Sequence, residues 1–197
     1  VYGDGTFSRC LGAFLSRHPD VELALETAER DRVMEAMVAR RFDIGVGSLP
    51  MPDAGLDVHP FASRRAVCVL PRGHRLATRP VVHARDLNGE RLLGQMSESP
   101  FRHYVEATLQ AEGVTPRRGI RARTQWALCN LVAEGAGVAL VDEEATFGFS
   151  QGEMVIRPFE PEIAWQAVVM TPSGVTPSAV TRAFLDWVRV FYAPVPG

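Results

Sequence analysis

Catalysis or metal binding in this chain would have to come from its histidines or its clustered carboxylates. No two histidines show the His-x-x-x-His spacing that places a pair of metal ligands on one helical face; they are His18, His59, His74, His83 and His103. His74 lies in Pro-Arg-Gly-His, where it is expected to bond the backbone of a turn. The run Asp142-Glu143-Glu144 fits the start of a short helix, where carboxylates are favoured electrostatically. We therefore expect no catalytic residue and no metal site.

Two glycine pairs could belong to phosphate-binding turns, but neither has the required context. Gly45-Val46-Gly47 follows a strand pattern, yet Ser48-Leu49-Pro50 stands where the dinucleotide pattern needs its third glycine. Gly135-Ala136-Gly137 lies between a helix pattern and a strand pattern, which is the reverse of the order in a phosphate loop. We expect both pairs to serve backbone turns, and we expect no cofactor.

The composition is that of an ordinary globular domain. Of 197 residues, 46% are hydrophobic and 22% are charged, and the formal net charge is -2. A nucleic-acid-binding surface usually carries a basic excess, which this chain lacks. Arg117-Arg118 and Arg121/Arg123 are short stretches that we expect to be solvated. No apolar run approaches the roughly 18 residues that span a bilayer.

The cysteines and the first residue indicate the cellular compartment of the protein and whether this chain is a fragment. Cys10, Cys68 and Cys129 are far apart and form no Cys-x-x-Cys, which favours buried thiols in a reducing cytoplasm. Val1-Tyr2 resembles the end of a strand that has already begun. We therefore expect a cytoplasmic protein of which this chain is a fragment.

The apolar residues alternate between helical and strand spacing, which predicts an α/β fold with largely parallel sheets. Helices are predicted at 7–15, 33–38, 101–109, 128–132 and 180–191, and strands at 21–26, 44–46, 66–70, 92–94, 120–123, 138–141, 154–159 and 164–170. Ser99 with Pro100, Thr124, and Thr176 with Pro177 suit helix starts.

This order of elements predicts two α/β lobes. Residues 1–70 and 164–197 would form lobe I, and residues 71–163 would form lobe II. The chain would leave the first lobe near Leu70 and return near Ala164, so that two crossing strands make a hinge. A ligand is expected in the cleft between the lobes.

Four predicted helix starts follow strands, so they should face this cleft, where the carboxyl ends of strands meet. Free backbone N–H groups at helix starts bind carboxylates. The alternative is that these polar residues only cap their helices. They are Asp4-Gly5-Thr6, Glu29-Arg30, Ser97-Glu98-Ser99 and Thr124-Gln125-Trp126.

A set of motifs along nearly the whole chain resembles the effector-binding domain of LysR-type transcriptional regulators. The resemblance implies a two-lobed type 2 periplasmic-binding-protein-like fold, a homodimer, and an N-terminal winged helix-turn-helix that is absent from this chain. It implies a small-molecule sensor and not an enzyme. The motifs are His18-Pro19-Asp20-Val21, Phe42-Asp43-Ile44-Gly45, Cys68 to Ala77, Asp86-Leu87, Glu112-Gly113 and Leu131 to Val138.

The resemblance also implies roles for particular residues. The helices at 31–41 and 125–134 would form the dimer faces. The segment from Tyr2 to Phe14 is about three residues shorter than the family pattern, so either the first turn differs here or residues are missing from this stretch. The effector pocket would include Gly5, Thr6, Arg30, Ser48, Ser99, Phe101 and Thr124.

Residues 41–45, 66–71 and 140–142 look similar to the branch of this family that senses amino acids and opines. On that hypothesis Asp4, Glu29 and Glu98 hold an ammonium group, while Arg30 and the helix starts hold a carboxylate. Two alternatives remain open. One is an exported solute-binding protein on the same fold, and the other is a dehydratase or deaminase, which would need a tuned acid or base in the cleft.

Overall fold

The computed structural model describes residues 5–52, 54–96, 99–150 and 152–193. These residues divide into two compact units. Unit 1 holds the described residues of 1–63 and 165–197, and unit 2 those of 64–164. The chain passes from unit 1 to unit 2 inside one long strand, β2 (Leu56–Pro71), and returns at the start of another, β8 (Ala164–Pro172).

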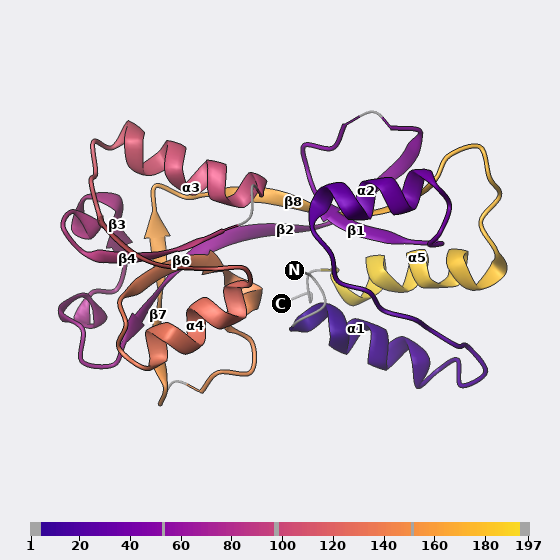
Figure 1. The fold of residues 1–197 in the computed structure, drawn as a ribbon. Helices are drawn as coiled ribbons and strands as arrows, with labels where there is room; N and C mark the ends of the chain where they lie inside the picture. The colour runs from indigo at the N-terminus through magenta and orange to yellow at the C-terminus, as the bar shows by residue number, and fades with distance from the viewer. Residues whose placement is uncertain (1–4, 53, 97–98, 151, 194–197) are drawn as a thin grey trace. The chain divides into compact units, whose positions relative to one another are not determined.

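Unit 1 is a short sheet with helices on both faces (Figure 1). The strand order is β1-β8-β2, and β1 (Gly45–Ser48) runs antiparallel to β8. Val169 of β8 packs with α1 (Thr6–Leu15) and α5 (Ala179–Phe191), while Val168 and Met170 pack with α2 (Arg30–Val38) on the other face. The two faces alternate because successive side chains of a strand point to opposite sides.

Gly45, in the Phe-Asp-Ile-Gly motif, permits this packing. A Cβ at Gly45 would lie 3.0 Å from both Met170 Cε and Met37 Cγ. The glycine therefore lets the fully buried Met37 of α2 approach β1 closely.

Unit 2 is a larger mixed sheet in the order β5-β4-β6-β2-β7, with the short strand β3 beside β7. Strand β4 runs parallel to both β5 and β6, whereas β2 runs antiparallel to β6 and β7. Figure 1 shows α3 and α4 on opposite faces of this sheet. The bounds are β3 Val82–His83, β4 Arg91–Gln95, α3 Pro100–Ala111, β5 Arg117–Ala122, α4 Gln125–Ala133, β6 Val138–Asp142 and β7 Met154–Glu160, with 3-10 turns η1 Arg75–Thr78, η2 Ala84–Leu87 and η3 Glu143–Thr146.

The core of unit 2 forms between α4 and the sheet. Leu128 and Val132, one helical turn apart, are fully buried against Val67, Leu93 and Val141. Strand β6 is buried along its whole length, which explains why its sequence is an unbroken apolar run up to Asp142.

Three predictions about the fold were wrong. The sheets are mixed and not largely parallel. Residues 21–26 form no strand: within the described residues this segment pairs with no β-ladder, and Leu23 and Leu25 are exposed. Helix α5 begins after Ser178, whose hydroxyl accepts the Thr181 N–H, and not after Thr176. The Ser178 hydroxyl is placed to cap the helix, which explains why α5 begins there and not at Thr176-Pro177.

Candidate functional site

The starts of α3 and α4 lie at the same edge of the unit 2 sheet. The two helices follow the parallel strands β4 and β5, whose carboxyl ends are joined by a bond from the Met96 N–H to the Ala122 carbonyl. Ser99 caps α3 by accepting the Arg102 N–H, and Thr124 caps α4 by accepting the Ala127 N–H at 3.2 Å. Each cap satisfies one N–H of its first turn.

Gln95 ties these elements together at the end of β4. Its buried side chain accepts a hydrogen bond from the Ser99 hydroxyl at 3.2 Å. Its carbonyl accepts two bonds from the Arg121 guanidinium, at 3.1 and 3.3 Å. The α3 start and Arg121 are therefore held at one point of the sheet edge.

A buried ionic cluster lies beside the start of α4. The Gln125 side-chain oxygen accepts the Asp142 N–H at 2.7 Å, and Asp142 accepts the Glu144 N–H at 3.0 Å. Arg64 Nε lies 3.8 Å from the Asp142 carboxylate, and Arg64 also donates to Glu144. Gln125 thereby connects the start of α4 to this cluster.

The Asp142 carboxylate is destabilised by its surroundings. Burial raises the pKa of Asp142 from 3.8 to about 6, although the Arg64 guanidinium lowers it. The cost of removing a carboxylate from water exceeds the attraction of its partner, as is common for buried ion pairs. Asp142 is therefore a group that titrates just below neutral pH.

In unit 1 the predicted residues surround the starts of α1 and α2. Gly5 precedes α1 with φ 105°, a conformation that favours glycine, and Thr6 is the first helical residue. Arg30, the first residue of α2, donates to the Ser48 carbonyl at 3.5 Å and to the Pro50 carbonyl. The structure thus brings Arg30 to the end of β1, beside Ser48.

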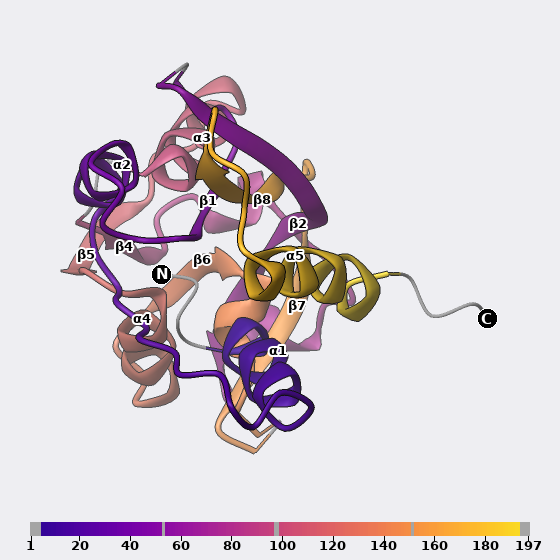
Figure 2. The same cartoon turned by 90° about the vertical axis from the view of Figure 1, so that its right-hand side faces the viewer.

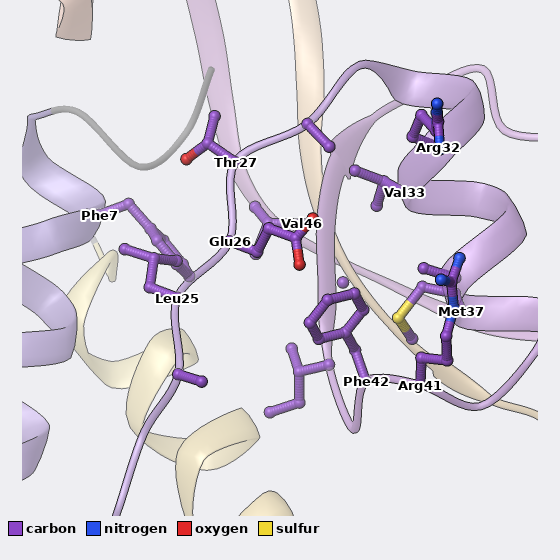
Figure 3. Close-up of a pocket in the computed structure, with 15 residues that line it drawn as sticks. Phe7, Leu25, Glu26, Thr27, Arg32, Val33, Met37, Arg41, Phe42 and Val46 are labelled. Atoms are coloured by element: carbon purple, nitrogen blue, oxygen red, sulfur yellow. The ribbon is translucent and has the colours of Figure 1, made fainter.

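A cavity of about 270 Å³ lies within unit 1. Figure 3 shows Phe7 and Leu25 on one side and Arg32, Val33 and Met37 of α2 on the other. It is lined by Phe7, residues 24–28, Arg32, Val33, Ala36, Met37, Arg41, Phe42 and residues 44–46. No predicted pocket residue within the described part of the chain lines this cavity, although Ala28 and Arg32 lie within two positions of Glu29 and Arg30 in sequence.

Residues 148–152 match the Gly-x-Ser-x-Gly pattern, with Ser150 at the position of the nucleophile. The nucleophile elbow needs a strand before this motif and a helix after it. Here the motif lies between η3 and the strand β7, and the Ser150 hydroxyl lies 2.9 Å from the Glu153 carboxylate. The position of Ser150 does not match that of a hydrolase nucleophile.

Three further predicted residues lie at helix starts without a binding role that the contacts identify. Phe101 is buried in the first turn of α3, and Trp126 is 52% exposed at the start of α4, 6.0 Å from Phe149 between ring centroids. Glu29 precedes α2 without capping it through its side chain. Asp4, Ser97 and Glu98 lie outside the described residues.

Sequence reasoning missed Gln95, Arg64 and the role of Asp142. A polar residue directly after the apolar strand at 92–94 was a signal for Gln95. The pair Arg64-Arg65, just before the buried strand at 66–70, was a signal that a cation enters the core. Their partners lie 4 to 80 residues away, so spacing alone could not pair them.

Residues 2–191 match the family model described as the LysR substrate binding domain. Among curated proteins, the regulatory protein NocR of Agrobacterium tumefaciens is 33% identical over 177 residues, which cover 90% of this chain and 59% of NocR. The octopine catabolism/uptake operon regulatory protein OccR of Rhizobium meliloti is 28% identical over 92% of this chain and 59% of its own length. The chain thus spans about 59% of these relatives.

Among solved structures, the CcmR regulatory domain of Synechocystis PCC6803, in complex with 2-PG, superposes with a TM-score of 0.85 and 22% identity. The match covers 98% of this chain and 93% of that domain. The predicted fold class, the two-lobed α/β fold of these regulators, is thereby confirmed. No helix in the described part of the chain is both long and apolar enough to cross a membrane.

Proposed function

The chain belongs to the LysR substrate binding domain family, and we propose that it senses a small carboxylate or amino-acid-like effector on behalf of a DNA-binding transcriptional regulator. Its relatives are named as regulatory and activator proteins, so the chain is assigned to regulators and not to enzymes. The name of the octopine regulator among these relatives supports an effector that combines carboxylates with nitrogen-bearing groups.

The observation that carries the proposal is the set of polar helix starts at strand ends. Ser99 caps α3, and Thr124 satisfies one backbone N–H of α4, whose first turn offers its other N–H groups to an anion. In unit 1, Arg30 adds a guanidinium at the end of β1. Guanidinium groups and helix starts both favour carboxylates. Glu29, with Asp4 and Glu98, is proposed to hold the ammonium group of a zwitterion.

The wider assembly is also a proposal. We place the chain in a cytoplasmic homodimer whose faces include the helices at 31–41 and 125–134. DNA would be bound only through an N-terminal winged helix-turn-helix domain, and no membrane would be involved. Effector binding would shift the chain between two states, which requires that the effector bind one of them more tightly.

A thermal-shift screen followed by calorimetry tests the proposal. The ligands are octopine, lysine and arginine, with benzoate as an aromatic acid without an ammonium group. A ligand at about 100 times its Kd adds about 2.7 kcal/mol to the free energy of unfolding. Stabilisation by the zwitterions supports the proposal, and stabilisation by benzoate alone would retain the sensor but reject the amino-acid class.

Two matched arginine variants locate the site. Arg30→Ala removes the guanidinium at the end of β1, whereas Arg32→Ala removes one that lines the unit 1 cavity. We expect Arg30→Ala to weaken binding about tenfold or more, as for a charge-assisted hydrogen bond, and Arg32→Ala to have little effect. The reverse result would place the ligand in the cavity and reject the site at the helix starts.

A further inference from the structure

Two buried glutamines lie at the edge of the unit 2 sheet where α4 begins. Gln95 is the last residue of β4 and is 5% exposed, and Gln125 is the first residue of α4 and is 4% exposed. Among the described residues, no other amide side chain is as deeply buried. Burial of a polar side chain costs free energy unless its donors and acceptors have partners, so the partners of these two amides are informative.

The oxygen of each amide is held by a donor of the chain. Gln125 Oε1 accepts the Asp142 N–H at 2.7 Å. Because a backbone N–H can only donate, the oxygen and not the nitrogen of Gln125 must face Asp142. Gln95 Oε1 accepts the Ser99 hydroxyl at 3.2 Å. These two bonds fix the orientation of both amides and direct their NH2 groups away from Asp142 and Ser99.

The NH2 groups of these amides have no acceptor among the described residues. Each NH2 group carries two N–H donors. A donor that is removed from water and left without an acceptor costs more free energy than an ordinary hydrogen bond contributes. Gln95 and Gln125 therefore offer four N–H donors to an acceptor from outside the chain.

Both glutamines lie on the face of the sheet that α4 covers. Leu93 packs against α4, and Gln95, two residues further along β4, points to the same face. Ala122, the neighbour of Gln95 in β5, also packs against this core. Figures 1 and 2 both show α4 on one side of β4 and β6 and α3 on the other side.

The two amides also lie at neighbouring strand ends. Strand β4 runs parallel to β6 and pairs with it through Leu93. Two residues further along, Gln95 lies level with Val141, directly before Asp142. Since Gln125 bonds the Asp142 N–H, its amide lies at the end of β6, beside the end of β4 that carries Gln95.

A cluster of N–H donors recognises a group that only accepts hydrogen bonds. A carboxylate presents two acceptor oxygens and no donor, whereas a carboxamide presents one oxygen and an NH2 group that would face other NH2 groups. The first turn of α4 adds backbone N–H donors beside Gln125, and its dipole favours an anion. We propose that Gln95 and Gln125 determine the specificity of the α4 start: their amides bind a carboxylate of the effector and reject the corresponding carboxamide.

This inference rests on the proposed function and adds the residues by which unit 2 would distinguish an acid from its amide. Titration calorimetry on the unmodified chain provides the first measurement, with the pairs arginine and argininamide, lysine and lysinamide, and benzoate and benzamide. Each acid that binds should do so at least about tenfold more tightly than its carboxamide, because hydrogen bonds to a charged group are among the stronger ones.

Substitution at each glutamine assigns this preference to its amide. Gln95→Met and Gln125→Met keep the length of the side chain and remove its donors, so each should weaken binding of the acid about tenfold and reduce the preference for the acid over the carboxamide. Gln125→Glu keeps the oxygen that accepts the Asp142 N–H and replaces the NH2 group by an oxygen. This variant should prefer the carboxamide, whose NH2 group can donate to the new oxygen.

Gln110, exposed on α3 and without a side-chain bond among the described residues, supplies the matched controls. Gln110→Met and Gln110→Glu make the same chemical changes in unit 2, and both should keep the affinity and the acid preference of the unmodified chain. Circular dichroism checks the fold of every variant. If the Gln125 variants fail to fold, Gln95→Met and Gln95→Glu give the same test, because Gln95 takes no part in the bond to Asp142.

An acid preference that stays unchanged in the Met and Glu variants would overturn the inference, since both amides would then bond only water. Equal affinity of an acid and its carboxamide for the unmodified chain would do the same. Failure of the proposed function has a different signature: none of the acids would bind the unmodified chain, and the inference would be rejected with it.

Discussion

The titration of Asp142 provides a quantitative test of the cluster beside α4. Its pKa is about 6 in the folded chain and 3.8 without the fold, because burial outweighs the attraction of Arg64. A group whose pKa is raised on folding binds its proton more tightly in the folded state. The stabilisation of the folded chain by the protonation of Asp142 is therefore complete well below pH 3.8 and is lost as the pH rises through 6.

The size of the effect follows from this shift. Protonation of Asp142 contributes about 3 kcal/mol to the free energy of unfolding well below pH 3.8, about 1.4 kcal/mol at pH 5 and almost nothing at pH 7.5. Other carboxylates change stability over the same range, so the unmodified chain alone does not isolate Asp142. Asp142→Asn removes this titration, together with the charge that attracts Arg64, and keeps a side-chain oxygen that can accept the Glu144 N–H.

Urea unfolding at pH 7.5 and pH 5, at equal ionic strength, measures the difference. On going to pH 5 the unmodified chain should gain about 1.4 kcal/mol relative to Asp142→Asn. Glu112→Gln serves as a control, because Glu112 is exposed and lies outside the cluster. A relative loss by the unmodified chain at pH 5 would refute the reasoning, because it would mean that the ion pair with Arg64 lowers the pKa of Asp142 below 3.8.

Three further predictions concern packing, capping and thiols. Gly45→Ala should destabilise the chain by about 1–3 kcal/mol in urea unfolding, since its Cβ would meet Met37 and Met170; Gly12→Ala, in a helix with open space around it, should stabilise by about 0.5–1 kcal/mol. Thr124→Ala should cost about 1 kcal/mol through loss of the α4 cap, whereas Thr124→Ser should cost little; equal losses would contradict the capping role. Burial raises the pKa of Cys68, and that of Cys129 to about 12, so neither thiol should react with Ellman's reagent at pH 8 until urea unfolds the chain; rapid labelling of the native chain would contradict this.

Local sequence signals predicted the helix starts well. Ser99 with Pro100, and Thr124, cap their helices as predicted, because the cap is a short-range interaction between residues three apart. Gly113 and Gly135 end α3 and α4 with positive φ for the same local reason. The apolar strand at 138–141 was equally clear, since burial on both faces removes every polar residue from it.

Features that depend on residues far apart in the sequence were predicted less well. The alternation of Val21, Leu23 and Leu25 predicted a strand, but a strand also needs a neighbouring ladder, which the described residues do not supply. The pairing of Arg64 with Glu144 joins residues 80 apart, so no spacing rule could have found it. The candidate effector residues remain predictions, although the contact of Arg30 with Ser48 joins two of them from different elements of unit 1.

The cluster around Asp142 also bears on how an effector could act. Gln125, a proposed effector-binding residue, accepts a hydrogen bond from the Asp142 N–H. Arg64, whose guanidinium lies beside the Asp142 carboxylate, is the first residue of unit 2 and lies on β2, the strand that enters this unit. If the effector binds as proposed, its carboxylate at the start of α4 would place a second negative charge next to Asp142. That charge would raise the pKa of Asp142 further, and by linkage the protonated Asp142 would favour anion binding. Carboxylate affinity should therefore rise as the pH falls from 7.5 towards 5, and this dependence should disappear in Asp142→Asn.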